Sequence, residues 1–153
     1  MASKHQFTGM TGLYLVAAEL AKREFVVSPT SRSALTADLL VTDATCRNIY
    51  AVQVKTNSAP NRTFWLVGPG TSKLVSKHYV YALVNLREAG PEIYFVPSKV
   101  VARKVRVTPE GRKTIFYSVL RKDVAKYRDK WGIFKNERMK LKETTDKQIA
   151  AEP

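Results

Sequence analysis

Residues 37–55 read ADLLVTDATCRNIYAVQVK, which is two short apolar runs separated by a polar turn. The runs are Asp38–Val41, which is short and hydrophobic, and Ile49–Lys55, which is rich in the β-branched and aromatic residues that favour strands. The residues between them, Asp43–Asn48, have turn chemistry. We therefore expect two strands of one sheet, joined as neighbours in a hairpin.

Three polar residues interrupt these apolar strands. Alternation along a strand places Gln53 and Lys55 on one face and Val54 on the other. A Gln and a Lys on a central strand are costly to bury without partners, and Asp38 is equally out of place. In a hairpin the three side chains can meet at one point, which is typical of a functional site. The alternative is a water-facing edge strand, with Asp38 paired to a neighbour such as Arg47.

The stretch from Thr11 to Arg23 predicts a helix, because its apolar residues recur at helical spacing and form one stripe. These residues are Leu13, Val16, Ala17, Leu20 and Ala21. Glu19 lies at the flank of the stripe. It could point along the sheet towards the same polar group, or it could form a surface ion pair with Arg23 at i+4. Spacing alone leaves both open.

The rest of the chain alternates between predicted strands and short helices. Further strands are expected at Phe25–Val27, Phe64–Val67, Tyr79–Leu86, Ile93–Val96 and Thr114–Leu120, with helices at Lys99–Arg106 and Asp123–Trp131. We expect one domain over residues 1–134 and a polar, flexible tail over residues 135–153. The fold class is α/β, with a central mixed sheet of about five strands and helices on its faces.

Charge limits the kind of partner. The chain carries 26 Lys and Arg against 13 Asp and Glu, a net charge of +13. Residues 135–153 contribute only +1, so residues 1–134 carry +12. A folded domain this positive repels itself, and an anionic partner, most often nucleic acid, neutralises it.

Several classes of protein are excluded by what the sequence lacks. Cys46 is the only cysteine, so there is no internal disulfide and no cysteine-based zinc cluster. No apolar run approaches the ~20 residues of a membrane span, and residues 1–10 do not have the layout of a signal peptide. We expect no membrane partner and a cytoplasmic protein.

The order of a helix containing Glu, a strand with Asp and a strand ending in Gln-x-Lys resembles the PD-(D/E)XK superfamily of restriction-endonuclease-like nucleases. The resemblance covers residues 12–55. Gln53-Val54-Lys55-Thr56 is similar to the QVKT ending of one subgroup, which includes small bacterial or phage nucleases and homing endonucleases encoded in group I introns. The resemblance implies a restriction-endonuclease-like core and an endonuclease that cuts DNA with Mg²⁺ or Mn²⁺.

The resemblance also implies a role for each residue of the group. Asp38 would bind the metal, Gln53 would bind it through its side-chain oxygen, and Val54 would add its backbone carbonyl; all are oxygen donors, which Mg²⁺ prefers. Lys55 would position the attacking water and stabilise charge at phosphorus. Glu19 would contact the metal from the helix side.

Two residues depart from the family pattern. Ala37 stands where the motif name has proline, a common change. Gln53 stands where most members have Asp or Glu, which removes one negative charge from the metal site. The sequence therefore leaves open a catalytically inactive DNA-binding module on the same fold, and a basic RNA-associated protein with a coincidental pattern.

Contacts with double-stranded DNA are expected outside the metal site as well. Ser31 and Arg32, in the loop before Asp38, and Arg47, in the predicted turn, are the candidates for phosphate contacts. Cutting both strands of a duplex usually requires two sites, so we expect a homodimer or homotetramer.

Overall fold

The computed structural model describes residues 3–31, 36–108, 111 and 113–135. It begins with α1 (Lys4–Ala21), which starts earlier than the predicted Thr11. Ser3 caps this helix, because its side chain accepts a hydrogen bond from the Gln6 N–H while the Gln6 side chain accepts one from the Ser3 N–H. The early start follows from this capping box rather than from the apolar stripe.

The central sheet confirms the predicted α/β class with a mixed sheet. Its strands are β1 (Val26–Pro29), β2 (Leu39–Thr42), β3 (Ile49–Asn57), β5 (Tyr79–Asn85) and β6 (Glu92–Pro97), in the order β1-β2-β3-β5-β6. β2 and β3 form the predicted antiparallel hairpin, whereas β3 and β5 are parallel. The parallel pair requires a crossover between its strands. That crossover forms one wall of the cleft described below.

A second, three-stranded sheet has the order β4-β8-β7. It contains β4 (Phe64–Val67), β8 (Tyr117–Leu120) and the short β7 (Arg106–Val107). The crossover consists of β4 and the 3-10 turn η1 (Pro69–Ser72). The predicted helix Lys99–Arg106 is wrong at its end, because α2 (Ser98–Lys104) stops at Val105, whose backbone is extended, and Arg106 already pairs with β8.

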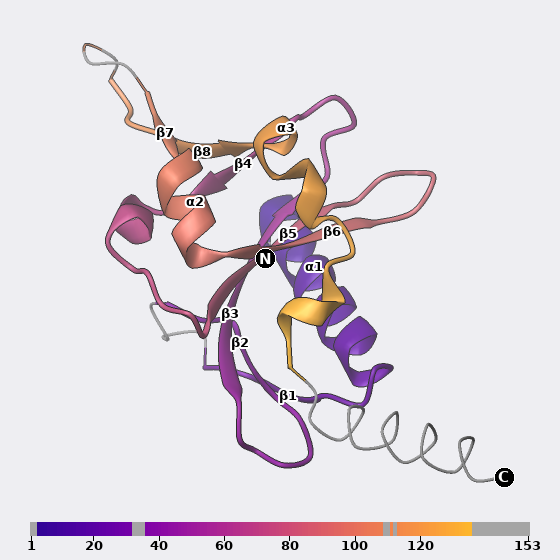
Figure 1. The fold of residues 1–153 in the computed structure, drawn as a ribbon. Coiled ribbons are helices and arrows are strands. Elements are labelled where there is room, and N and C mark those ends of the chain that lie inside the picture. Colours follow the sequence, from indigo (N-terminus) through magenta and orange to yellow (C-terminus); the bar gives the residue numbers. More distant parts are fainter. Residues whose placement is uncertain (1–2, 32–35, 109–110, 112, 136–153) are drawn as a thin grey trace, which may run out of the picture.

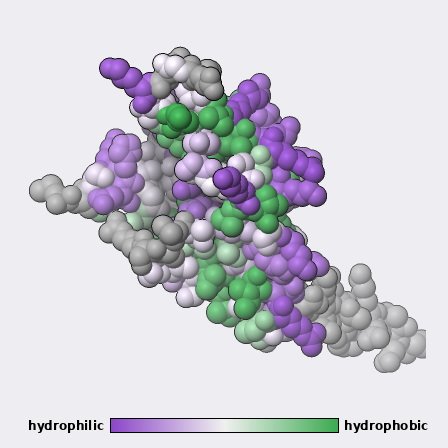
Figure 2. Space-filling view, turned by 90° about the vertical axis from the view of Figure 1, so that its left-hand side faces the viewer, coloured by the Kyte–Doolittle hydropathy of each residue, from purple (hydrophilic) through white to green (hydrophobic). Residues whose placement is uncertain are grey.

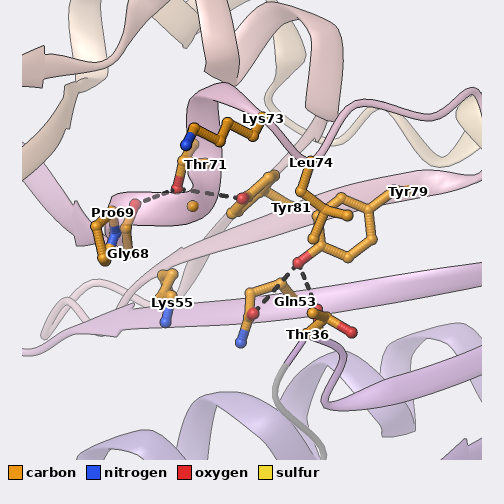
Figure 3. A pocket seen from close by; sticks show the side chains of 11 residues that line it. Thr36, Gln53, Lys55, Gly68, Pro69, Thr71, Lys73, Leu74, Tyr79 and Tyr81 are labelled. Carbon is orange, nitrogen blue, oxygen red and sulfur yellow. Dashed lines mark hydrogen bonds between the residues drawn. The ribbon is translucent and has the colours of Figure 1, made fainter.

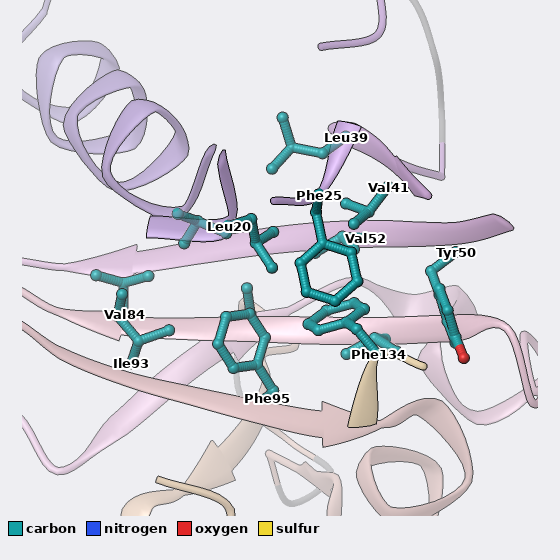
Figure 4. Close-up of a cluster of buried hydrophobic side chains, with 13 residues drawn as sticks. Leu20, Phe25, Leu39, Val41, Tyr50, Val52, Val84, Ile93, Phe95 and Phe134 are labelled. Atoms are coloured by element: carbon teal, nitrogen blue, oxygen red, sulfur yellow. The ribbon is translucent and has the colours of Figure 1, made fainter. Parts of the chain in front are cut away.

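Side chains alternate across β5, and each face of the central sheet therefore has its own core. Val80, Ala82 and Val84 pack into a cluster with α1, whereas Tyr79, Tyr81 and Leu83 pack into a second cluster. Figure 4 shows the first cluster, in which Leu20 and Phe95 are fully buried. In Figure 1, α1 covers one face of the sheet, while α2 and the small sheet cover the other. Three layers result.

The backbone of α1 lies unusually close to β3 at Gly12. A Cβ built on Gly12 would lie 1.9 Å from the hydroxyl oxygen of Thr56 and 2.9 Å from its Cβ. Only glycine permits this approach, which holds the first half of α1 beside the end of β3.

The predicted helix Asp123–Trp131 is wrong, because the segment breaks into short pieces. These pieces are α3 (Arg121–Val124), η2 (Ala125–Tyr127) and η3 (Trp131–Ile133). The backbone is extended at Arg128 and turns through a positive φ of 51° at Asp129, so no helix can continue. Val124 is buried as expected, and Trp131 packs on Phe95 with ring centroids 4.6 Å apart.

The predicted polar tail, residues 135–153, lies outside the described residues apart from Lys135. Within the part of the chain that is described, no helix combines the length and the apolar character needed to cross a bilayer. On the face shown in Figure 2, apolar patches are separated by hydrophilic side chains, as is normal for a surface in contact with water.

Candidate active site

The candidate site lies at an edge of β3 that β2 leaves open. The ladder between the two strands ends with Leu39 opposite Val52, and the backbone N–H of Asp38 donates to the Val52 carbonyl at 2.8 Å. The chain then turns away. The carboxylate of Asp38 replaces the backbone carbonyl that a paired strand would supply, because its Oδ2 accepts a hydrogen bond from the N–H of Val54 at 2.7 Å.

Gln53 joins Asp38 at this edge. Its Nε2 donates to the same carboxylate oxygen at 2.7 Å, and its Oε1 faces the hydroxyl of Tyr79 at 3.3 Å. The Tyr79 hydroxyl also contacts the backbone carbonyl of Thr36, from the segment before Asp38. Burial, followed by the neighbouring Tyr81 and Asp38, raises the pKa of Tyr79, so this hydroxyl keeps its proton at neutral pH.

Lys55 lies on the same face of β3 as Gln53, as alternation predicted, and both line a cleft of about 440 Å³. The opposite wall is the crossover segment Gly68–Leu74, which brings Lys73 into the cleft. Figure 3 shows Lys55 and Gln53 below this wall and Tyr79 beside Gln53. Two lysines in one cleft, with no described residue as an ion-pair partner for either, favour an anionic ligand.

Asp38 and Val54 also border a smaller cavity of about 280 Å³ on the α1 side of the edge. The helix contributes five residues to that cavity, none of them acidic: His5, Gln6, Gly9, Met10 and Leu13. Asp38 is the acidic residue among the described lining residues of this smaller cavity. Its hydrogen bond with Gln53 connects it to the larger cleft, whose described lining holds no acidic residue.

The oxygen donors at this edge suit a hard divalent cation. Asp38 offers a carboxylate, Gln53 an amide oxygen and Val54 a backbone carbonyl. The N–H and C=O of one strand residue point to the same side, so the Val54 carbonyl points to the edge where its N–H meets Asp38. The donor set is weakly charged, because the described residues hold no group of three or more His, Cys, Asp or Glu that could bind a metal.

Glu19 is not brought to this group. Lys22 and Arg23 bind its two carboxylate oxygens at 2.9 and 2.7 Å, which is the surface ion pair that the sequence left open. These hydrogen bonds, that of Arg23 above all, lower the pKa of Glu19. The cavity beside Asp38 reaches along α1 only to Leu13, and Glu19 lies about 9 Å further along the helix axis. The structure thus has Glu19 in ion pairs, and a metal contact from this residue stays a prediction.

The three residues proposed to contact DNA are not placed alike. Ser31 lies near the site, because the preceding N–H of Thr30 donates to the Asp38 carbonyl at 2.9 Å. Arg47 is exposed in the turn at the other end of the β2–β3 hairpin, before β3 begins at Ile49. The strand from Ile49 to Gln53 alone spans about 13 Å. Arg32 falls outside the described residues.

Two of the residues around the site were missed in the sequence. Tyr79 and Thr36 are 26 and 17 positions from Gln53 in the chain, and only the β3–β5 register brings Tyr79 next to it. The sequence feature that could have identified Tyr79 is the alternation in Tyr79-Val80-Tyr81, which places two hydroxyl groups on one face of a buried strand.

Neither the protein-family models nor the curated proteins contain a match for this chain. Among solved structures, the chain is similar to a bacterial homing endonuclease, I-Ssp6803I, with a TM-score of 0.53 and 16% identity over 99% of this chain and 100% of that one. It also matches Hjc, a Holliday junction resolvase from the hyperthermophilic archaeon Archaeoglobus fulgidus, with a TM-score of 0.49 and 14% identity over 76% and 87% of the two chains. The likeness to the homing endonuclease confirms the predicted restriction-endonuclease-like α/β fold.

Proposed function

We propose that this chain, which has the fold of PD-(D/E)XK nucleases, is an endonuclease that hydrolyses DNA phosphodiester bonds with Mg²⁺ or Mn²⁺. One observation carries the proposal: Asp38, Gln53 and the backbone of Val54 meet at an open strand edge, and Lys55 lies in the adjoining cleft. The net charge of +13 supports a nucleic-acid substrate.

Each residue of the site has a distinct task in this proposal. Asp38, Gln53 and Val54 would hold the divalent ion, which when bound activates water and neutralises charge on the phosphate. Lys55 would orient the attacking water and stabilise the negative charge that develops on the phosphate oxygens. Because β3 pairs with β5 at this residue, the backbone of Lys55 is fixed at the floor of the cleft and its side chain can reach a bound phosphate.

The substrate backbone would run along the open edge of β3 and enter the cleft beside Lys55. Ser31 would contact a phosphate next to the scissile one, and Arg47 would contact the duplex further along. A duplex needs two cuts, so we propose a homodimer or homotetramer, which sedimentation equilibrium measures directly. The full-length likeness to a homing endonuclease supports a homing or other selfish-element enzyme.

Cleavage of supercoiled plasmid tests the proposal. The wild type should nick or linearise the plasmid with Mg²⁺ and should leave it intact with EDTA. Lys55→Ala should lower the cleavage rate by about 100-fold or more, while DNA affinity changes by less than about threefold. Lys104→Ala, which removes the same charge from the end of α2, is the control and should cut normally. Equal rates for the two variants would contradict the role of Lys55.

A second function is favoured by the amide at position 53. The Gln53 side-chain N–H donates a hydrogen bond to the Asp38 carboxylate, so this arrangement of the two side chains needs no cation. The described site also has a single carboxylate, which gives a cation little charge to bind. The alternative is a DNA-binding module that does not cut. In that case the protein binds duplex DNA, its affinity does not depend on Mg²⁺, and plasmid stays intact at every metal concentration.

A further inference from the structure

The amide of Gln53 lies between two oxygen groups, the carboxylate of Asp38 and the hydroxyl of Tyr79. Its nitrogen is 2.7 Å from Asp38 Oδ2, and its oxygen is 3.3 Å from the Tyr79 hydroxyl. In this orientation the amide oxygen, which is the atom that could bind a metal, faces away from Asp38.

The Tyr79 hydroxyl has one proton, and the carbonyl oxygens of Thr36 and Gln53 both lie within hydrogen-bonding reach of it. The backbone carbonyl of Thr36 can only accept a hydrogen bond, and it is the nearer of the two oxygens. The proton is therefore donated to Thr36, and the lone pairs of the hydroxyl face Gln53. The Gln53 oxygen thus faces another oxygen whose proton points elsewhere.

A half turn of the amide changes both contacts. The Gln53 nitrogen would then donate to the lone pair of Tyr79, which is the better partner for that hydroxyl. The Gln53 oxygen would face the Asp38 carboxylate, and two oxygens at such a distance repel each other unless a cation lies between them. One orientation thus suits the metal-free edge and the other suits a metal.

We infer that Tyr79 is a positioning residue that holds the Gln53 amide in its metal-binding orientation by accepting the amide N–H. This inference rests on the proposed metal-dependent function and adds a residue that the Asp-Gln-x-Lys pattern does not contain. Tyr79 needs its hydroxyl oxygen for this role, and Thr36 keeps that oxygen available by taking the proton.

Calorimetric titration of the DNA-free protein with Mn²⁺ tests the inference. Tyr79→Phe removes the acceptor and should weaken Mn²⁺ binding by about three- to tenfold, the worth of one neutral hydrogen bond. Tyr81→Phe is the matched control: Tyr81 is the next residue on the same face of β5 and is similarly buried, and its hydroxyl contacts Thr71 and Tyr79 and makes no hydrogen bond to Gln53. That variant should keep the wild-type affinity.

A double-mutant cycle separates positioning from a merely structural role. A carboxylate at position 53 needs no half turn, because both of its oxygens bind metal. Tyr79→Phe should therefore change Mn²⁺ affinity by less than about twofold in a Gln53→Glu background. A loss as large as in the Gln53 background would mean that Tyr79 only supports the Thr36 segment, and would overturn the inference.

The wild type alone gives a further test that does not depend on how the variant folds. With Mg²⁺ bound, nuclear Overhauser effects should appear between the side-chain amide protons of Gln53 and the ring of Tyr79, and they should be absent with EDTA. If the wild type binds no Mn²⁺, the proposed metal site fails together with the inference. If it binds Mn²⁺ but the amide contacts stay the same, or Tyr79→Phe behaves like Tyr81→Phe, the inference alone is overturned.

Discussion

At the scale of single residues, the Asp38 carboxylate both accepts hydrogen bonds and carries a negative charge, and different substitutions remove one role or both. One oxygen of its carboxylate accepts hydrogen bonds from a side-chain amide and a backbone N–H, both at 2.7 Å. The negative charge strengthens both bonds and attracts a cation. An isosteric amide keeps an acceptor for the backbone and removes the charge, whereas alanine removes both.

Asp38→Asn and Asp38→Ala should therefore differ. Asn should lower Mn²⁺ affinity at least about tenfold and cost less than about 1 kcal/mol of unfolding free energy. Ala should lose the metal as well and cost about 1–3 kcal/mol, because the Val54 N–H and the Gln53 amide lose their acceptor. Urea denaturation and calorimetry measure the two effects. Equal stability of the two variants would contradict a structural role for the carboxylate.

Gln53→Glu tests the charge of the site. A second carboxylate beside Asp38 should destabilise the metal-free protein by like-charge repulsion and bind the cation more tightly. The rise in melting temperature on adding Mg²⁺ should exceed that of the wild type, and EDTA should reverse it. Thermal denaturation with and without metal measures this difference; an equal rise in both proteins would indicate that residue 53 does not contact the ion.

At the scale of secondary-structure elements, the position of α1 on β3 depends on one glycine. Gly12→Ala would force the helix away from Thr56 and should destabilise the protein by about 1–3 kcal/mol, as overpacking usually does. Gly9→Ala is the matched control on the same helix, because nothing lies within 4 Å of the added Cβ. That change should stabilise by about 0.5–1 kcal/mol. Urea denaturation of both variants should give opposite signs.

Glu92 links β6 to the broken C-terminal segment and makes its packing sensitive to acid. Burial alone would raise the pKa of Glu92, but a hydrogen bond from Asn85 and the charges of Arg128 and Arg121 outweigh it, so the pKa lies below its ordinary value of 4.5. A lowered pKa means that these contacts stabilise the fold above about pH 4.5 and that this stability is lost as the pH falls further.

Glu92→Gln should therefore lower the unfolding free energy at neutral pH by about 1 kcal/mol and flatten its fall below pH 4.5. Glu88→Gln, in the turn between β5 and β6, is exposed and serves as the control. Denaturant unfolding between neutral pH and pH 3 compares the three proteins. If the unfolding free energy of Glu92→Gln still fell steeply below pH 4.5, the acid sensitivity would come from other carboxylates.

Local pattern was sufficient for the elements that lie near the site. Strand alternation and turn chemistry predicted the β2–β3 hairpin and the shared face of Gln53 and Lys55, because both are properties of adjacent residues. The small sheet could not be predicted, because β7 has two residues and exists only through pairing with β8. The position of Glu19 could not be predicted either: its spacing allowed two orientations, and only the structure shows the ion pair with Arg23.

At the scale of the whole molecule, the net charge of +13 should dominate the affinity for DNA. Each phosphate neutralised by a Lys or Arg releases counterions, so log affinity should fall linearly with log salt concentration. We expect a slope of about −4 or steeper for a duplex, which corresponds to roughly five phosphate contacts. Fluorescence anisotropy across a salt series measures it. A slope near zero would mean that the positive charge of the protein does not contribute to DNA binding.

The hydrogen bond from Val54 to Asp38 also has a consequence for solubility. A strand with an open edge presents unpaired N–H and C=O groups, and such edges recruit strands from other molecules. The Asp38 carboxylate occupies the donor of Val54, and its charge repels an approaching backbone carbonyl. The residue proposed to hold the metal thus also protects the sheet from pairing with a second copy, so variants that lack this carboxylate should aggregate sooner than their loss of stability alone would cause.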